Sequence, residues 1–274
     1  MKTALSLGWE WLCYKESDQA RTFTVHSVFD RLINISGDEK LLSITASGVG
    51  GSSSFLMLPD KVLDLGVKAG EICVLHAGRA NLGRVFIDFS EAPIWKGPVD
   101  KFYRQKSIKN ENIAAFKSVL DRLAHGESAW RTLNDDSAAR FPGLKAIKKL
   151  RENPALARNL IGLGSGLTPS GDDMLLGFLA VVNHTCDDRA FVKRLRVLLS
   201  ASTRRTVDIA EKMLANALEC EYHETLQNSL RDLCEGTKED IYISAASLIK
   251  LGSSSGSDIA TGMYFGMIDH QNDG

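Results

Sequence analysis

One stretch of the chain reads Gly162-Leu-Gly-Ser-Gly-Leu-Thr-Pro-Ser-Gly-Asp-Asp-Met-Leu-Leu-Gly177. It places flexible backbone, hydroxyl groups and two adjacent carboxylates directly before an apolar run with helical spacing. A partial copy comes later, where Ser255-Gly-Ser-Asp-Ile-Ala-Thr-Gly262 repeats the pattern Ser-Gly-x-Asp-x-x-x-Gly that starts at Ser170. The repeat predicts two helices that start alike and converge on one site. A glycine one turn beyond each aspartate, at Gly177 and Gly262, would let these helices cross closely.

The chain around these motifs has two halves with different sequence periods. The first half contains short β-rich runs separated by Gly, Asp, Asn or Pro, over residues 23–28, 41–45, 55–58, 71–76 and 84–89. The second half carries apolar residues at helical spacings, over residues 112–124, 144–151, 173–183, 189–200, 207–218, 226–234, 239–251 and 258–268. The sequence therefore predicts an α+β fold, with a small antiparallel β-domain over residues 1–98. A mostly α-helical domain over residues 99–274 would carry both motifs.

Charge and composition limit the classes of partner. The 274 residues include 33 basic and 34 acidic side chains, which gives a formal net charge of −1 and no global field for nucleic acid or an anionic membrane. The five cysteines form no Cys-x-x-Cys pair, which argues against a disulfide framework or a structural zinc site. The N-terminus reaches Glu10 before a secretory apolar core is built, and apolar runs such as residues 178–182 are too short to span a bilayer. We expect a soluble cytoplasmic protein that binds neither nucleic acid nor membranes.

Several common catalytic motifs are absent from the sequence. The run from Gly162 to Gly166 has the wrong spacing for a dinucleotide loop and does not follow a clear strand. The sequence also contains no Walker A loop, no nucleophile elbow and no His-Glu-x-x-His pattern. Covalent catalysis and a histidine-based metal centre are therefore unsupported.

The spacing Ser-x-x-Asp has an ordinary structural explanation. In Ser170 and Asp173, and again in Ser255 and Asp258, it predicts a helix cap in which hydroxyl and carboxylate satisfy free backbone amides. Each such cap contributes roughly 1 kcal/mol. The glycines inside the two helices likewise have a purely structural interpretation, which is close packing without a ligand. Capping leaves several residues of the first motif unexplained: Gly162, Gly164, Gly166, Thr168 and Asp172.

The residues left over indicate a binding loop. A glycine-rich loop before a helix start exposes amide donors at the positive end of the helix dipole, which suits phosphate or carboxylate ligands. Asp172 and Asp173 would repel an unaccompanied anion, so the loop also suits a cation, or an anion bridged by Mg²⁺. Arg205, between two expected helices, is a candidate clamp for a carboxylate or phosphate, although a solvated helix start explains it equally well.

Both motifs resemble the signatures of a bacterial protein family. The first resembles the signature of a family formerly of unknown function, once described as carboxylases and associated with the AllH-type subunit of oxamate carbamoyltransferase. The later run Leu251-Gly-Ser-Ser-Ser-Gly-Ser-Asp-Ile-Ala-Thr-Gly262 is similar to that family's second signature, Leu-Gly-x-x-Ser-Gly-x-Asp followed by a glycine. One position departs from the family, because Ser165 stands where proline is common. The departure loosens the loop and leaves its amides and carboxylates in place.

The resemblance implies a reaction and partners. The family is associated with allantoin and purine-nitrogen catabolism, in which a carbamoyl group moves between oxalurate and phosphate to give oxamate and carbamoyl phosphate. It also implies a hetero-oligomer with an FdrA-like subunit and an AllG-type subunit.

Residues from both motifs make up the expected site for such a small anionic substrate. Catalytic roles, in which the side chain binds Mg²⁺ or orients the transferred amide, are expected for Asp172, Asp173 and Asp258, the first two being the candidate Mg²⁺ ligands. Substrate contacts are expected from amides, hydroxyls and one guanidinium: Gly164, Ser165, Gly166, Thr168, Ser170, Ser255, Gly256 and Arg205.

Two other classes of function fit the same residues. A Mg²⁺-dependent hydrolase or a carboxylase-like enzyme would use Asp172, Asp173 and Asp258 as metal ligands. A non-catalytic assembly subunit would instead use the glycine-rich face to dock a partner chain.

Overall fold

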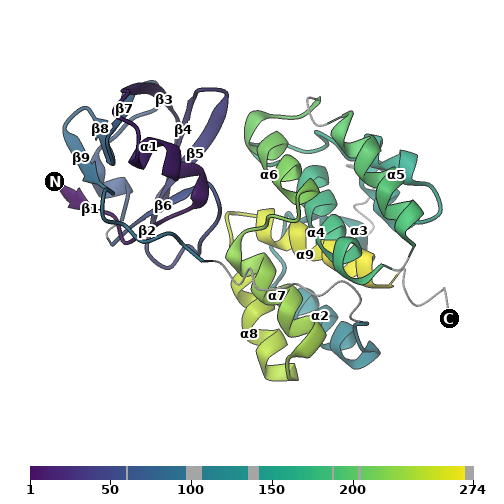
Figure 1. Cartoon of the computed structure of the whole chain (residues 1–274). Coiled ribbons are helices and arrows are strands. Elements are labelled where there is room, and N and C mark those ends of the chain that lie inside the picture. Colours follow the sequence, from purple (N-terminus) through teal and green to yellow (C-terminus); the bar gives the residue numbers. More distant parts are fainter. Residues whose placement is uncertain (60, 97–106, 135–141, 187, 203–204, 269–274) are drawn as a thin grey trace. The chain divides into compact units, whose positions relative to one another are not determined.

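The computed structural model describes residues 1–274 apart from 60, 97–106, 135–141, 187, 203–204 and 269–274. The chain divides into two compact units, Met1–Val99 and Asp100–Gly274. Figure 1 shows strands in the first unit and helices in the second, which confirms the predicted α+β fold class. No helix among the described residues combines the length and the apolar character needed to cross a membrane.

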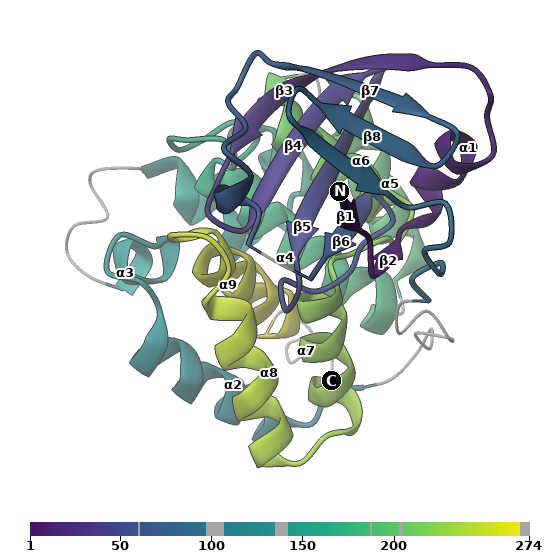
Figure 2. The same ribbon diagram turned by 90° about the vertical axis from the view of Figure 1, so that its left-hand side faces the viewer.

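The described part of the first unit is one nine-stranded sheet with the order β1-β9-β8-β7-β3-β4-β5-β6-β2. Its strands are β1 (Lys2–Thr3), β2 (Ser6–Leu7), β3 (Arg21–Val28), β4 (Leu32–Gly37), β5 (Lys40–Ala46), β6 (Phe55–Leu58), β7 (Ile72–His76), β8 (Arg79–Leu82) and β9 (Val85–Asp88). Neighbouring strands are antiparallel, as β3, β4 and β5 show in Figure 2, except for the parallel pairs β1–β9 and β5–β6. Short helical turns follow β2, in η1 (Trp9–Trp11) and α1 (Leu12–Lys15), and η2 (Leu63–Leu65) precedes β7.

The N-terminal segment joins the two edges of this sheet. The amide of Ala4 donates to the carbonyl of Asp88 at 2.8 Å, and the amide of Leu5 donates to the carbonyl of Met57 at 2.8 Å. Edge strands carry unpaired amides and carbonyls that are exposed to intermolecular pairing. Since β1 pairs with β9 and β2 pairs with β6, one short segment covers both edges. Alternate apolar side chains from the strands fill the core beneath, which includes Phe23, Val25, Ile33, Ile35, Leu42, Ile44, Leu56, Leu58 and Leu75.

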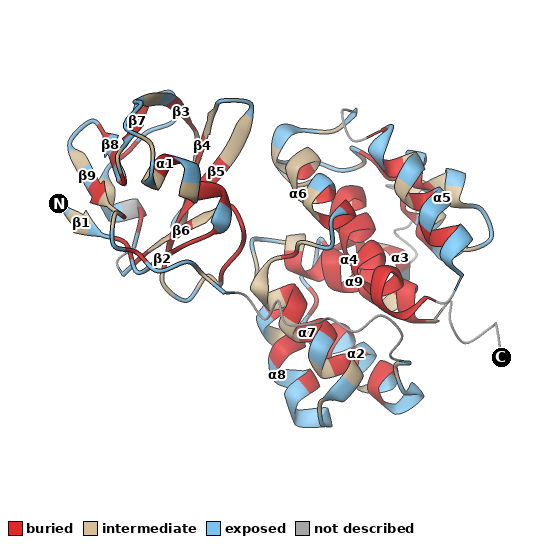
Figure 3. Cartoon of the chain, viewed as in Figure 1, coloured by how far each residue is buried: buried red, intermediate tan, exposed pale blue. Residues whose placement is uncertain are grey.

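The helical unit is built around α4 and α9. Its described helices are α2 (Asn110–Leu123), α3 (Ala129–Asn134), α4 (Ser170–Thr185), α5 (Arg189–Ser200), α6 (Asp208–Leu218), α7 (Glu224–Glu235), α8 (Lys238–Ile249) and α9 (Ser255–Ile268), with 3-10 turns η4 (Pro142–Lys149) and η5 (Pro154–Asn159). Figure 3 shows α4 and α9 buried along most of their length, whereas the surrounding helices bury one face. The α-helix expected at residues 144–151 is wrong, because that run forms the 3-10 turn η4. Prolines at both ends of this region keep the helical turns short.

Glycines bring α4 and α9 into backbone contact. A Cβ at Gly177 would overlap the carbonyl oxygen of Ile259, and a Cβ at Gly262 would overlap the carbonyl oxygen of Met174. The two contacts are equivalent. Met174 and Ile259 occupy the same position in the two motifs, three residues before Gly177 and Gly262 respectively. The expected close crossing of the two helices is confirmed.

Substitution of either glycine should destabilise the helical unit. We expect Gly177→Ala and Gly262→Ala to lower the free energy of unfolding by about 3 kcal/mol, since the added methyl overlaps backbone atoms rather than a mobile side chain. Gly126→Ala is the matched control, because its Cβ would meet nothing within 4 Å, and it should change stability by less than about 0.5 kcal/mol. Urea denaturation measures all three. Equal stabilities for Gly177→Ala and Gly126→Ala would contradict the close crossing.

Candidate functional site

The glycine-rich loop folds back on the start of α4. Gly162, Gly164 and Gly166 have φ values of 72°, 131° and 88°, in the region that favours glycine. A Cβ at Gly164 would lie 2.6 Å from the amide nitrogen of Ser170, and the amide of Gly171 donates to the carbonyl of Leu163 at 2.8 Å. The first motif is therefore a loop packed against its own helix, and glycine is required where the loop turns.

Asp172 links this loop through hydrogen bonds to the segment before α6. Its Oδ1 accepts from the amide of Gly162 at 3.0 Å, and its Oδ2 accepts from the hydroxyl of Thr206 at 2.5 Å. The side chain is buried, and burial raises its pKa while the hydrogen bonds from Thr206 and Gly162 oppose that rise. Both oxygens of Asp172 thus have protein donors.

Asp173 and Asp258 each lie beside a hydroxyl group of the other helix. The hydroxyl of Ser255, the first residue of α9, lowers the pKa of Asp173 on α4, and the hydroxyl of Ser170, the first residue of α4, lowers the pKa of Asp258 on α9. The hydroxyl of Thr168 acts on the pKa of Asp173 in the same direction. The predicted convergence of the two motifs is thus seen as a reciprocal pair of contacts.

The two carboxyl groups lie in a dry environment. Asp173 is 2% exposed and Asp258 is 0% exposed. Burial raises the pKa of Asp258 to about 6 and raises the pKa of Asp173 well above its usual range, and the nearby charge of Asp258 adds to the rise at Asp173. One oxygen of each, Oδ2, has no hydrogen-bond partner among the described residues.

The expected capping pair is wrong at the start of α4. Ser170 is the first helical residue, and the cap position is Pro169, which makes no side-chain capping bond. Because Ser170 is already inside the helix, it is not at the capping position, and its hydroxyl lies beside the carboxyl of Asp258 on the other helix. A capping box is present at α8, where Thr237 and Asp240 have the same spacing.

The other predicted substrate contacts include an exposed loop and three hydroxyl groups. Gly164, Ser165 and Gly166 are exposed, and their amides donate no backbone hydrogen bond to any described residue. Half-buried hydroxyl groups lie on Thr168, Ser170 and Ser255. The loop and these hydroxyls thus offer both donors and acceptors near the helix crossing.

Gly256 and Arg205 have different positions. A Cβ at Gly256 would overlap the carbonyl oxygen of Leu248, so this glycine is required for packing between α8 and α9. Arg205 is exposed, and its carbonyl oxygen lies 3.0 Å from the position of a Cβ on Gly162. The backbone of Arg205 is thus beside the glycine-rich loop. The preceding Thr203 and Arg204, which belong to the same polar segment, lie outside the described residues.

Sequence reasoning missed two partners of Asp258. The amide of Ala129 at the start of α3 donates to its Oδ1 at 2.6 Å, and the hydroxyl of Ser254 lies beside the same carboxyl and lowers its pKa. Ala129 lies far from Asp258 in the sequence, and an alanine amide has no pattern that reveals it. Ser254 belongs to a run of three serines before α9, which was the available signal.

The carboxylates do not make a magnesium site on their own. Mg²⁺ takes about six oxygen ligands in octahedral geometry and usually keeps several waters. Asp172 has both oxygens bonded to protein donors, and Asp173 and Asp258 offer one free oxygen each in a buried position. Across the described ranges, no group of three or more His, Cys, Asp or Glu side chains is arranged to hold a metal ion. The site is better described as a hydrogen-bonding site.

Comparison with known proteins finds a family match for part of the chain. Residues 160–267, which lie within the helical unit and contain both motifs, match the family described as oxamate carbamoyltransferase subunit AllH. The match covers less than half of the chain, and the AllH-like resemblance is confirmed over these residues. No curated protein and no solved structure matches the chain.

The raised pKa of Asp258 predicts a pH-dependent stability. The folded chain binds this proton with a pKa of about 6, above the ordinary value of 3.8, so it holds more protons than the unfolded chain between these values. Stability is therefore lost as pH rises through this window, by about 3 kcal/mol for a shift of this size. Asp258→Asn should lack this contribution.

Urea denaturation between about pH 4 and pH 6 tests this prediction. We expect the unfolding free energy of the wild type to exceed that of Asp258→Asn by an amount that falls as pH rises across the range. Asp240→Asn is the control, because hydrogen bonds from Thr237 lower the pKa of Asp240 below 3.8, so its contribution is gained at lower pH and stays nearly constant across this range. A wild-type minus Asp258→Asn difference that stays constant with pH would exclude a titrating Asp258.

Proposed function

We propose that the chain is a catalytic subunit of an oxamate carbamoyltransferase in allantoin and purine-nitrogen catabolism. It would transfer a carbamoyl group between oxalurate and phosphate to give oxamate and carbamoyl phosphate. The AllH match over residues 160–267 supports the enzyme class. The observation that carries the proposal is the exposed loop 164–166, whose unused amides lie before a buried pair of carboxyl groups.

Carbamoyl transfer needs an anion held in position and an oxyanion stabilised. A phosphate oxygen attacks the carbamoyl carbon of oxalurate, the bond from that carbon to the oxamate nitrogen breaks, and the phosphate proton passes to that nitrogen. The amides of Gly164, Ser165 and Gly166 would position the phosphate or stabilise the negative charge that develops on the carbamoyl oxygen. This chemistry requires no covalent intermediate on the protein.

The hydroxyl groups at the two helix starts would orient the carbamoyl group. With their protons directed at Asp258 and Asp173, Ser170 and Ser255 would present their oxygen lone pairs as acceptors. These acceptors suit the N–H groups of a carbamoyl nitrogen. The buried carboxyls would then act by fixing the hydroxyls, whereas Asp172 would fix the loop through Gly162 and Thr206.

The assay requires the assembled complex. We would purify the chain alone and together with FdrA-like and AllG-type subunits, and measure oxalurate cleavage with and without phosphate. In the complex we expect Asp172→Asn and Asp173→Asn to lower kcat by about 100-fold, since each removes a group that positions substrate donors or acceptors. Asp240→Asn, which alters only the capping box of α8, should retain activity.

Three outcomes would contradict this proposal. Full activity of the complex with both Asp172→Asn and Asp173→Asn would remove the site from catalysis. Cleavage that is independent of phosphate would indicate a hydrolase. Loss of complex formation in these variants, with normal turnover per assembled complex, would indicate an assembly subunit; size-exclusion chromatography of each variant distinguishes that case.

A further inference from the structure

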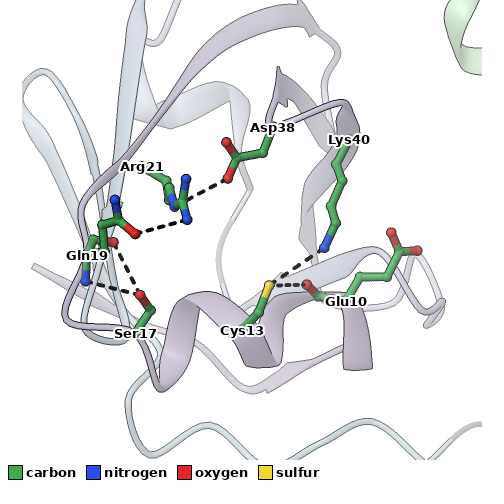
Figure 4. A network of polar contacts seen from close by, with 7 residues as sticks. All are labelled: Glu10, Cys13, Ser17, Gln19, Arg21, Asp38 and Lys40. Atoms are coloured by element: carbon green, nitrogen blue, oxygen red, sulfur yellow. Dashed lines mark hydrogen bonds and ion pairs between the residues drawn. The ribbon is translucent and has the colours of Figure 1, made fainter.

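The β-rich unit contains a second feature with the character of a binding site. A cavity of about 490 Å³ lies between α1 and the turn that joins β4 to β5. Figure 4 shows side chains around it, with Cys13 from α1, Arg21 from β3, Asp38 from the turn and Lys40 from the start of β5. Its volume is in the range of small-molecule sites.

Lys40 brings a positive charge without a carboxylate partner to this cavity. Its Nζ lies 3.6 Å from the thiol of Cys13 and 5.3 Å from the centre of the Tyr14 ring. It forms no ion pair with any residue that the structure describes. Arg21, the other cation, is paired with Asp38 at 3.6 Å and bonded to the side chain of Gln19 at 3.0 Å. The charge of Lys40 is therefore the one available to an anionic group.

The turn beside Lys40 has an uncommon backbone. Asp38 and Glu39 have φ values of 50° and 57°. Because Gly37 pairs with Lys40 across the hairpin, Asp38 and Glu39 form its two-residue turn. Asn-Gly is the preferred sequence for such a turn, and a side chain in this region costs about 1 kcal/mol. Glu39 lines the cavity without a partner among the described residues. The turn thus adds one unpaired negative charge.

We propose that this cavity binds a small zwitterion, an amino acid whose carboxylate contacts Lys40 and whose ammonium group contacts Glu39. The charges of the lining support this ligand class. The Arg21–Asp38 pair is neutral overall, so Lys40 and Glu39 leave one positive and one negative charge in the lining. A simple anion would be repelled by Glu39, and a simple cation by Lys40. The thiol of Cys13 lies beside Lys40, so a bound ligand would cover it.

Alkylation of Cys13 reports occupancy directly. The full chain would be treated with N-ethylmaleimide alone or with glycine, L-serine or β-alanine, and the rate at each cysteine followed by peptide mass spectrometry. When a zwitterion occupies roughly nine sites in ten, alkylation of Cys13 should slow about tenfold. We expect at least one of the three zwitterions to reach this degree of protection. Cys220, which is exposed and lies in the helical unit, should react at an unchanged rate and serves as the internal control. Acetate and methylammonium, with one charge each, should protect less.

Variants separate binding from a change in thiol reactivity. In Lys40→Gln and in Glu39→Gln, the concentration that gives half protection should rise about tenfold, the loss expected for one charged contact. Lys68→Gln, an exposed lysine of the same unit outside the cavity lining, is the matched control and should bind as wild type does. Failure of all three zwitterions to protect Cys13, equal protection by acetate, or unchanged protection in both variants would overturn the proposal. None of these results depends on carbamoyl transfer.

Discussion

The helical unit depends on one close contact, the crossing of α4 and α9. Gly177 and Gly262 let the two backbones touch, and at the same crossing the first residue of each helix places a hydroxyl beside a carboxyl group of the other. Two carboxyl groups can be buried here because hydroxyl and amide donors surround them. The contact also fixes where the glycine-rich loop begins, since that loop packs on the first turn of α4.

Burial of the carboxyl groups has an energetic consequence. Burying an ionised group is unfavourable unless it is paired or hydrogen-bonded, and the usual response is a raised pKa. Asp173 and Asp258 show this response, and Asp172 shows it more weakly because Gly162 and Thr206 bond to it. A packed apolar crossing would avoid the penalty. Polar groups at this crossing therefore carry a cost that ordinary helix packing does not require.

The sequence predicted features that depend on local patterns and missed those that depend on distant contacts. Helical periodicity and the repeated motif predicted the α4 and α9 starts and their convergence. The capping interpretation of Ser170 was wrong because local spacing selects the carboxylate three residues ahead, whereas the fold brings Asp258 from another helix. Strand β4 was missed because Asn34 interrupts its apolar pattern; in the sheet this amide is satisfied by the hydroxyls of Ser27 and Ser43. Such long-range compensation leaves no periodic signal in a sequence.

A double-mutant cycle measures the contact between the Ser170 hydroxyl and the Asp258 carboxyl across the helix crossing. The unfolding free energies of wild type, Ser170→Ala, Asp258→Asn and the double variant would be measured in urea at neutral pH. We expect a coupling energy of about 1 kcal/mol between Ser170 and Asp258, and a coupling within about 0.3 kcal/mol of zero between Ser170 and the distant Asp240. Additive effects of Ser170→Ala and Asp258→Asn would contradict this contact across the helix crossing.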